Sequence, residues 1–171
     1  MPKADLNGVG IYYEETGEGF PLVFAHELAG NTSSWKAQVS YFSRRYRVIT
    51  YNARGYPPSD VPGEVEDYSQ EQAVEDLYLL LQHLSIKQAH VGGLSMGGNM
   101  TLFFGLRHPE VAKSLIVAGA GTGSSDSILF KQQSERYAAQ LEANGIAGLD
   151  DYLLGPTRAR FKRKDPTGWA E

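Results

Sequence analysis

Short, continuously apolar runs recur along the first 120 residues of the chain, separated by longer segments of mixed character. Runs of this length without polar interruptions are typical of strands that are buried on both faces of a sheet. Four such strands are predicted, at residues 21–27, 46–55, 88–94 and 113–120.

The intervening segments place apolar side chains at helical spacing, as Trp35, Val39 and Phe42 do within residues 32–43. A second helix is predicted after Ser69, which forms a possible capping box with Gln72. A third is predicted over residues 96–107. Strands that alternate with helices predict an α/β fold: a doubly wound, mostly parallel sheet with helices on both faces.

Both ends of the chain differ from this alternation. Near the N-terminus, Asn7-Gly8 lies between two extended runs, which is the signal of a two-residue β-hairpin. After Gly123 no further buried strand is predicted. Residues 124–145 have the pattern of a solvated amphipathic helix, and residues 146–155 that of a shorter one.

Composition excludes several classes of protein. The chain has 171 residues, a formal net charge of −4 and no cysteine, so a thiolate nucleophile and cysteine-based metal sites are excluded. No run of 18 apolar residues is present, and the first ten residues have no apolar signal core. We therefore expect a cytoplasmic protein without a membrane or nucleic-acid partner. The basic cluster near the end is interpreted as solvated surface; it comprises Arg158, Arg160, Lys162, Arg163 and Lys164.

The clearest chemical signal is Gly93-Leu94-Ser95-Met96-Gly97, a G-x-S-x-G pattern between a predicted strand and a predicted helix. Such a turn forces the serine into a strained backbone conformation and projects its hydroxyl at the helix N-terminus. The flanking glycines allow neighbouring chain to pack closely. The pattern predicts a nucleophilic Ser95 with positive φ. The alternative is a glycine-rich turn that serves packing alone.

Four segments together, "VFAHELAG", "YNARGYPPSD", "VGGLSMGG" and "LRHPEVAKSLIVAG", resemble the α/β-hydrolase fold family in order and approximate spacing. The resemblance is to compact esterases, lactonases and C–C hydrolases, and it covers the N-terminal part of their fold. It implies that residues 1–123 are the N-terminal part of the hydrolase core and residues 124–171 the start of a helical lid. The C-terminal part of the fold is expected to be missing.

The resemblance also implies site residues. Ser95 corresponds to the nucleophile, and the backbone N–H groups of Leu28 and Met96 correspond to the oxyanion hole. His26 is implied to be structural, and it supports the motif together with Gly93 and Gly97. No cofactor and no metal are implied. "HELAG" begins like the zinc motif H-E-x-x-H, but Gly30 occupies the position of its second histidine.

Two positions depart from the family pattern. Glu27 stands where glycine is usual, and a carboxylate about 6 Å from an oxyanion would cost roughly 3 kcal/mol at an effective dielectric near 20. Glu27 must therefore point away, be paired, or shape substrate choice. Asn52 stands where an aspartate often precedes Arg-Gly. In the loop that follows, Arg54 and Asp60 are interpreted as a pair that fixes the loop.

The catalytic acid and base of the family follow the serine in the chain, first Asp or Glu and then His. None of the four histidines, His26, His83, His90 and His108, has that position. Asp126 lies near an alternative acid position of some relatives. We therefore expect the acid and base to lie beyond residue 171, and the isolated chain to be inactive.

The predicted parent function is hydrolysis of small-molecule carboxylic esters or lactones through an acyl-enzyme on Ser95. Serine argues against the dehalogenase and epoxide-hydrolase branches, which use aspartate at this position. C–C bond hydrolase, thioesterase and cofactor-free haloperoxidase activities stay open, as do a split hydrolase and a non-catalytic receptor or interaction protein. Because absent strands would leave the strand at 113–120 uncovered, a homo-oligomer or a complementing C-terminal segment is also expected.

Overall fold

A computed structural model describes residues 2–121, 126–145, 148, 163, 164 and 166. The chain divides into two compact units, Met1–Gly121 and Thr122–Glu171. The first unit contains the sheet and the G-x-S-x-G turn. The interpretation of the second as the start of a lid stays a prediction.

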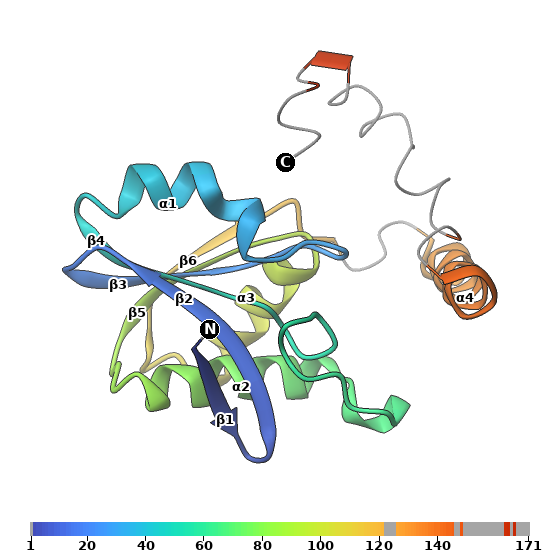
Figure 1. Ribbon diagram of the computed structural model, residues 1–171, viewed down its shortest axis with the longest axis horizontal. Helices are drawn as coiled ribbons and strands as arrows, with labels where there is room; N and C mark the ends of the chain where they lie inside the picture. Colours follow the sequence, from blue (N-terminus) through green and yellow to red (C-terminus); the bar gives the residue numbers. More distant parts are fainter. Residues whose placement is uncertain (1, 122–125, 146–147, 149–162, 165, 167–171) are drawn as a thin grey trace. The chain divides into compact units, whose positions relative to one another are not determined.

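A six-stranded mixed sheet forms the centre of the first unit (Figure 1). The strand order is β1-β2-β4-β3-β5-β6; β3, β4, β5 and β6 run parallel, while β1 and β2 are antiparallel to their neighbours. The predicted α/β fold with a mostly parallel sheet is confirmed. The strands are β1 (Lys3–Leu6), β2 (Val9–Thr16), β3 (Phe20–Ala25), β4 (Tyr46–Tyr51), β5 (Ala89–Leu94) and β6 (Ala112–Ala118).

The predicted hairpin joins β1 and β2. Asn7 and Gly8 have φ values of 56° and 87°, the two positive values that a tight hairpin turn of this kind requires. Asp5 stabilises the turn, since its Oδ1 accepts a hydrogen bond of 2.7 Å from the backbone N–H of Gly8. The Asn-Gly pair therefore predicted the position of the hairpin turn correctly.

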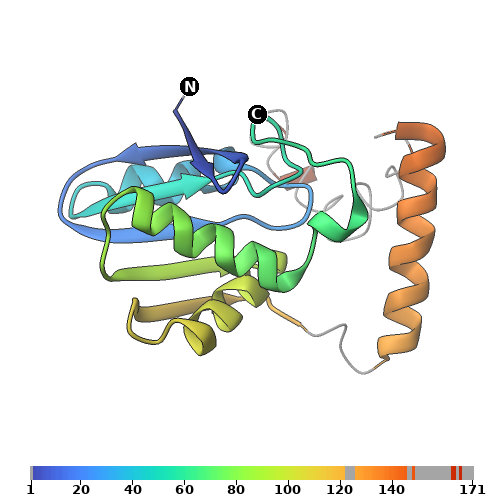
Figure 2. The same cartoon turned by 90° about the horizontal axis from the view of Figure 1, so that it is seen from below.

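Helices cover both faces of the sheet (Figures 1 and 2). Leu22, Phe24 and Val48 pack towards α1, whereas Val23 and Ile49 join the larger core beneath α2 and α3. Neighbouring residues of a strand thus face opposite helices, which explains why the strands read as continuous apolar runs. The helices of this unit are η1 (Thr32–Trp35), α1 (Lys36–Phe42), η2 (Val65–Asp67), α2 (Gln70–His83) and α3 (Met96–Arg107).

Two of the predicted helices differ from the pattern in detail. The segment 32–43 is not one helix but a 3-10 turn, capped by Asn31, followed by α1. Ser69 caps α2 as predicted, because its hydroxyl accepts the N–H of Gln72 at 3.0 Å. The reciprocal half of the capping box is wrong: the Gln72 side chain donates instead to Asp76 at 3.3 Å.

The strand β6 forms one edge of the sheet among the described strands. Leu115, Ile116 and Val117 are all exposed, although consecutive residues of a strand point to opposite faces. Leu115 packs beside Gly105 of α3, so one face is partly covered, but an exposed apolar edge strand can still pair with other chains. Self-association of the 171-residue chain stays a prediction, and a monomeric mass in sedimentation experiments would contradict it.

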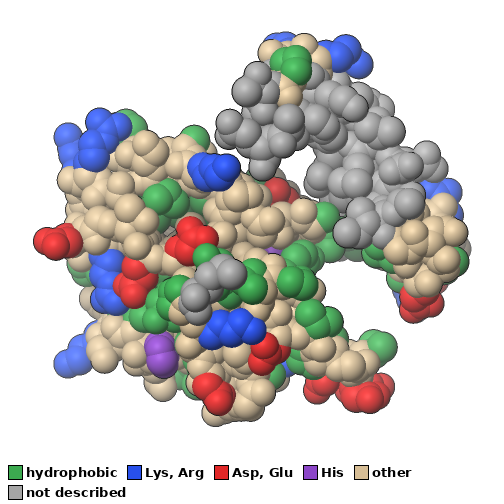
Figure 3. Space-filling model, in the orientation of Figure 1, with side chains coloured by type: hydrophobic (Ala, Val, Ile, Leu, Met, Phe, Trp, Pro, Cys, Tyr) green, Lys and Arg blue, Asp and Glu red, His purple; other side chains and the backbone are tan. Residues whose placement is uncertain are grey.

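In the second unit, α4 spans Ser127–Asn144, within the predicted helix at 124–145. The helix expected at 146–155, apart from residue 148, and the basic residues Arg158, Arg160 and Lys162 lie outside the described residues. On the face shown in Figure 3, basic and acidic side chains of the described residues are interspersed. None of the helices described has the length and apolar character that a membrane crossing requires.

Candidate active site

The site is organised by the turn between β5 and α3. Ser95 has φ 53° and ψ −111°, so the predicted positive φ is confirmed. A non-glycine residue in this region stores backbone strain, which the surrounding structure must impose. Here the Ser95 N–H donates to the carbonyl of Ala118 at 2.9 Å, which ties the turn to the end of β6. The Ser95 side chain is exposed at the N-terminus of α3.

Both flanking glycines are required by close packing. A Cβ at Gly93 would meet the carbonyl oxygen of Gly97 and would lie 2.7 Å from Thr101 Oγ1. A Cβ at Gly97 would meet the backbone of Ala25, and it would lie 2.7 Å from the carbonyl oxygen of His26. The start of α3 therefore lies directly against the end of β3, and the loop that begins at His26 lies beside the serine turn.

That loop makes a tight turn at once. The Gly30 N–H donates to the Glu27 carbonyl at 3.0 Å, and Ala29 has φ 61°. Leu28 lies at the exposed corner of the turn. The two segments predicted to supply oxyanion N–H groups, Leu28 and Met96, thus come from neighbouring elements, as the resemblance implies. Their role as donors stays a proposal.

His26 is buried, and both of its ring nitrogens have backbone partners. Nδ1 lies 2.8 Å from the carbonyl oxygen of Glu27, and the Ala53 N–H donates to Nε2 at 3.1 Å. This pattern requires the neutral tautomer with its proton on Nδ1. Burial lowers the pKa of His26 below its ordinary value, outweighing the opposing effect of Glu27. The ring is directed at loop backbone, as expected for a structural residue.

A pH dependence of stability follows from His26. Because its folded-state pKa lies below the unfolded value of 6.5, the neutral ring stabilises the fold above that pH. The contribution is lost as the pH falls through the folded-state pKa, since a protonated Nε2 cannot accept the Ala53 N–H. Urea unfolding at several pH values between about 8 and 5 should show this loss. His26→Gln should flatten the dependence, and exposed His83→Gln should leave it unchanged; equal slopes in all three would contradict the assignment.

The Glu27 carboxylate is turned back over its own loop. Its Oε1 accepts a hydrogen bond from Ser34 Oγ at 3.2 Å, and a Cβ at Gly30 would lie 2.6 Å from its carboxyl carbon. Its Oε2 is buried without a hydrogen-bond partner among the described residues. The carboxylate thus has one hydrogen bond, from the Ser34 hydroxyl, and its influence on substrate choice stays a prediction.

The hydrogen bonds of Asn52 account for the second departure from the family pattern, an asparagine where an aspartate is frequent. Its Oδ1 accepts the Thr32 N–H at 2.9 Å, and its Nδ2 donates to the Pro57 carbonyl at 2.6 Å. A carboxylate could make only the first of these bonds, because it has no hydrogen to donate. The amide therefore joins the loop after β3 to the loop after β4.

The predicted pairing of Arg54 with Asp60 is wrong. Arg54 forms a buried, bidentate ion pair with Asp76 of α2, through Nε–Oδ2 and Nη2–Oδ1 distances of 2.6 Å each. Its Nη1 donates to the Asp67 carbonyl at 2.8 Å. These hydrogen bonds with Asp76 raise the pKa of Arg54. A signal was available in the sequence: Asp76 lies on the apolar face of its helix, where a carboxylate needs a cation.

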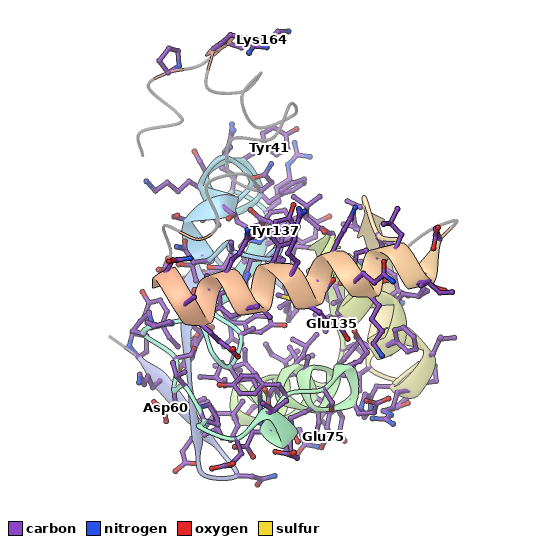
Figure 4. The ribbon with its side chains drawn as sticks, turned by 90° about the vertical axis from the view of Figure 1, so that its right-hand side faces the viewer. Tyr41, Asp60, Glu75, Glu135, Tyr137 and Lys164 are labelled. Atoms are coloured by element: carbon purple, nitrogen blue, oxygen red, sulfur yellow. The ribbon has the colours of Figure 1, made fainter. Side chains whose placement is uncertain are left out.

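Asp60 instead fastens its loop to the N-terminal hairpin. Its Oδ1 lies 2.8 Å from Lys3 Nζ, and its Oδ2 accepts the Gly10 N–H at 2.7 Å. Figure 4 shows Asp60 beside the N-terminal strands, away from Glu75 on α2. The Lys3 contact and the Gly10 N–H lower the pKa of Asp60. Asp60 and Arg54 therefore do not pair with each other, because each binds a partner on a different element.

The remaining candidates for acid and base have other contacts. His90 Nδ1 lies 2.7 Å from Ser114 Oγ, and His108 stacks on Tyr78 with ring centroids 4.1 Å apart. His83 contacts Tyr13 edge to face. Among the described residues, which include all four histidines, no hydrogen bond joins the Ser95 hydroxyl to a histidine.

Asp126 begins the second unit's helix. Its Oδ1 accepts the Leu129 N–H at 2.8 Å, so the carboxylate is an N-cap of α4. No group of three or more potential metal-binding His, Asp or Glu side chains occurs in the described part of the chain.

The model of the α/β-hydrolase fold family matches residues 21–148, which is most of the chain. The chain belongs to this family. The match includes the loop after β3, the buried ion pair and the serine turn. The resemblance inferred from the four sequence segments is confirmed.

Several family members are similar in sequence or in structure. The chain is 39% identical over 114 residues to 3-oxoadipate enol-lactonase 2 of Acinetobacter baylyi, covering 67% of this chain and 42% of that protein. It is 32% identical over 116 residues to epoxide hydrolase 3 of Xenopus tropicalis, covering 67% and 32%. The chain thus spans less than half the length of these relatives.

Among solved structures, the enol-lactonase from Burkholderia xenovorans superposes with a TM-score of 0.84 at 26% identity, covering 99% of this chain and 65% of that one. An enzyme that degrades N-acyl homoserine lactones superposes with a TM-score of 0.80 at 30% identity, covering 99% and 62%. Both are described as acting on lactones.

Proposed function

We propose that this chain is the N-terminal part of the catalytic apparatus of a serine hydrolase for carboxylic esters or lactones. The observation that carries the proposal is the strained, exposed Ser95 between β5 and α3. In this role Ser95 Oγ attacks the carbonyl carbon while a base takes its proton, and the proton passes to the alkoxide when the C–O bond breaks. The alcohol so formed departs from an ester and stays attached to the acyl group of a lactone. Water then hydrolyses the acyl-serine ester to the acid and free Ser95. The N–H groups of Leu28 and Met96 stabilise the oxyanion.

Three features support a lactone or ester substrate over an epoxide. The nucleophile position holds serine, whereas the resemblance implies aspartate in the epoxide-hydrolase branch. The sequence identity to the enol-lactonase, 39%, exceeds the 32% to the epoxide hydrolase. Both structural relatives named above act on lactones by their descriptions.

The general base is proposed to be a histidine from outside these 171 residues. His26 is excluded from this role by its two backbone contacts, and His83, His90 and His108 contact other partners. Such a histidine would belong to a longer form of the chain or to a second polypeptide. The acid that orients it would come from the same source.

Labelling with a fluorophosphonate tests the nucleophile directly. The reagent phosphonylates an activated serine and releases fluoride, so intact mass and peptide mapping identify the modified residue. We expect slow labelling at Ser95 alone, because the strained turn and helix N-terminus remain without the base. Ser95→Ala should remove the adduct, and Ser33→Ala, at an exposed serine of η1, should not. An adduct on other serines with none on Ser95 would favour a non-catalytic receptor or interaction protein.

A further inference from the structure

A cavity of about 370 Å³ lies in the first unit, between the loop after β4, the start of α2 and the start of α3. Its volume lies at the lower end of the range of small-molecule sites, about 300–1,000 Å³. Met96, Gly97 and His26 line it. The cavity therefore begins at the residue that follows Ser95, and the side chain of a proposed oxyanion donor forms part of its wall.

Three tyrosines and two methionines form part of the wall of the cavity: Tyr51, Tyr56, Tyr68, Met96 and Met100. The Tyr51 hydroxyl lies 4.0 Å from Met100 Sδ, and the Tyr56 hydroxyl lies 3.7 Å from Met96 Sδ. Burial raises the pKa of Tyr51, so its phenol stays a donor. Thioether sulfur is a weak acceptor, so the Tyr51 hydroxyl would donate more strongly to a ligand oxygen than to Met100. Methionine side chains also adapt their shape to a ligand more easily than branched side chains do.

The two charged side chains that line the cavity neutralise each other. Arg54 and Asp76 form the bidentate ion pair described above, and the third donor of Arg54 is directed to the Asp67 carbonyl. A charged ligand would gain no unpaired counter-ion among the described lining residues, and it would lose its hydration. Gln70 Nε2, in contrast, is buried without a hydrogen-bond partner among the described residues. This wall suits an uncharged ligand that carries an acceptor.

We propose that this cavity binds the apolar portion of the substrate: an uncharged aryl or compact alkyl group bonded to an ester or lactone carbonyl. The link to hydrolysis rests on the proposed function of Ser95, but binding itself does not. Ligands of this class would stack on the tyrosines and direct the alkoxy oxygen at the Tyr51 phenol or at Gln70. This leaves the carbonyl oxygen for the N–H groups of Leu28 and Met96. Carboxylates of the same shape are excluded by their charge.

The methionine methyl groups report on this site without any need for activity. The chain has three methionines, and two of them, Met96 and Met100, line the cavity. With ¹³C-methyl methionine, titration of the 171-residue chain with methyl benzoate should shift both signals saturably, and Met1 serves as the reference. Benzoate, the matched anion, should bind at least about tenfold more weakly. Equal affinity for the two would overturn the proposal.

A substitution that fills the cavity provides a second test of ligand binding. Ala73→Leu enlarges a lining residue on α2 and should weaken methyl benzoate binding at least about tenfold, while Ala37→Leu, at an exposed position of α1, should not. If Ala73→Leu does not fold, Gln70→Ala should weaken binding about fivefold through the lost hydrogen bond. Unchanged affinity in the folded variant would overturn the proposal.

Ser95→Ala separates this inference from the proposed function. The variant should bind methyl benzoate with unchanged affinity, because its hydroxyl does not line the cavity. Methyl shifts without fluorophosphonate labelling would leave the cavity site standing and reject the nucleophile. Labelling of Ser95 without methyl shifts would support the nucleophile and reject the cavity site.

Discussion

The 171-residue chain is expected to hydrolyse p-nitrophenyl acetate only at a residual rate. The described contacts provide a strained serine and a neighbouring turn at Leu28, but no histidine bonded to Ser95. In serine hydrolases that lack one triad member, the oxyanion hole and binding alone leave about 10³–10⁴-fold acceleration over water. Loss of the nucleophile or base costs about 10⁶ in kcat. The release of p-nitrophenolate gives the initial rate with the chain, which is compared with the rate in buffer alone.

Two variants make this expectation decisive. Ser95→Ala should leave the small rate of the chain almost unchanged, because a serine without a base contributes little and the oxyanion donors remain. Brisk turnover that disappears in Ser95→Ala would mean that a base is present after all. A matching loss in His26→Ala, in protein that is still folded by circular dichroism, would identify His26 as that base and overturn its structural assignment.

Gly97→Ala is expected to have the largest effect on stability. The added methyl group would meet the carbonyl oxygen of Ala25 and lie 2.7 Å from that of His26, so two backbone segments would have to separate. Neither segment can move freely, because Ala25 pairs with both Tyr51 and Gly93 in the sheet. We expect a loss of more than about 4 kcal/mol in the free energy of unfolding, a size reserved for severe core disruption.

The matched control is Gly63→Ala, since a Cβ at Gly63 would have no neighbour within 4 Å. It should change the free energy of unfolding by less than about 0.5 kcal/mol, as other surface substitutions do. Urea unfolding followed by circular dichroism compares the two variants with the parent chain. A Gly97→Ala variant as stable as the control would mean that α3 does not begin against β3.

The elements were predictable from the sequence because their signals are local. Buried strands, helical periodicity and the Asn-Gly hairpin depend on residues that are close in the chain, and each was found within a few residues of its predicted bounds. The positive φ of Ser95 was predictable for the same reason. Its glycine-flanked turn between strand and helix admits few backbone conformations.

Long-range pairing was not predictable to the same degree. The sequence offers two acidic partners for Arg54, namely Asp60 in its own loop and Asp76 on α2. Proximity in sequence favoured Asp60, but burial decided the outcome: a carboxylate on the apolar face of α2 is stable only beside a cation. Asp60, at the surface, was satisfied by Lys3 and Gly10.

By itself, then, the sequence determined the α/β architecture and the strained serine turn, whereas the position of a catalytic base outside this chain stays a prediction. Only the tertiary structure decided where side chains from different elements meet. The ring of His26 is held by Ala53, the carboxylate of Glu27 by Ser34, and the cavity beside Met96 exists because α2, α3 and the loop after β4 do not close fully. Each of these depends on packing between segments remote in sequence, which local patterns do not encode.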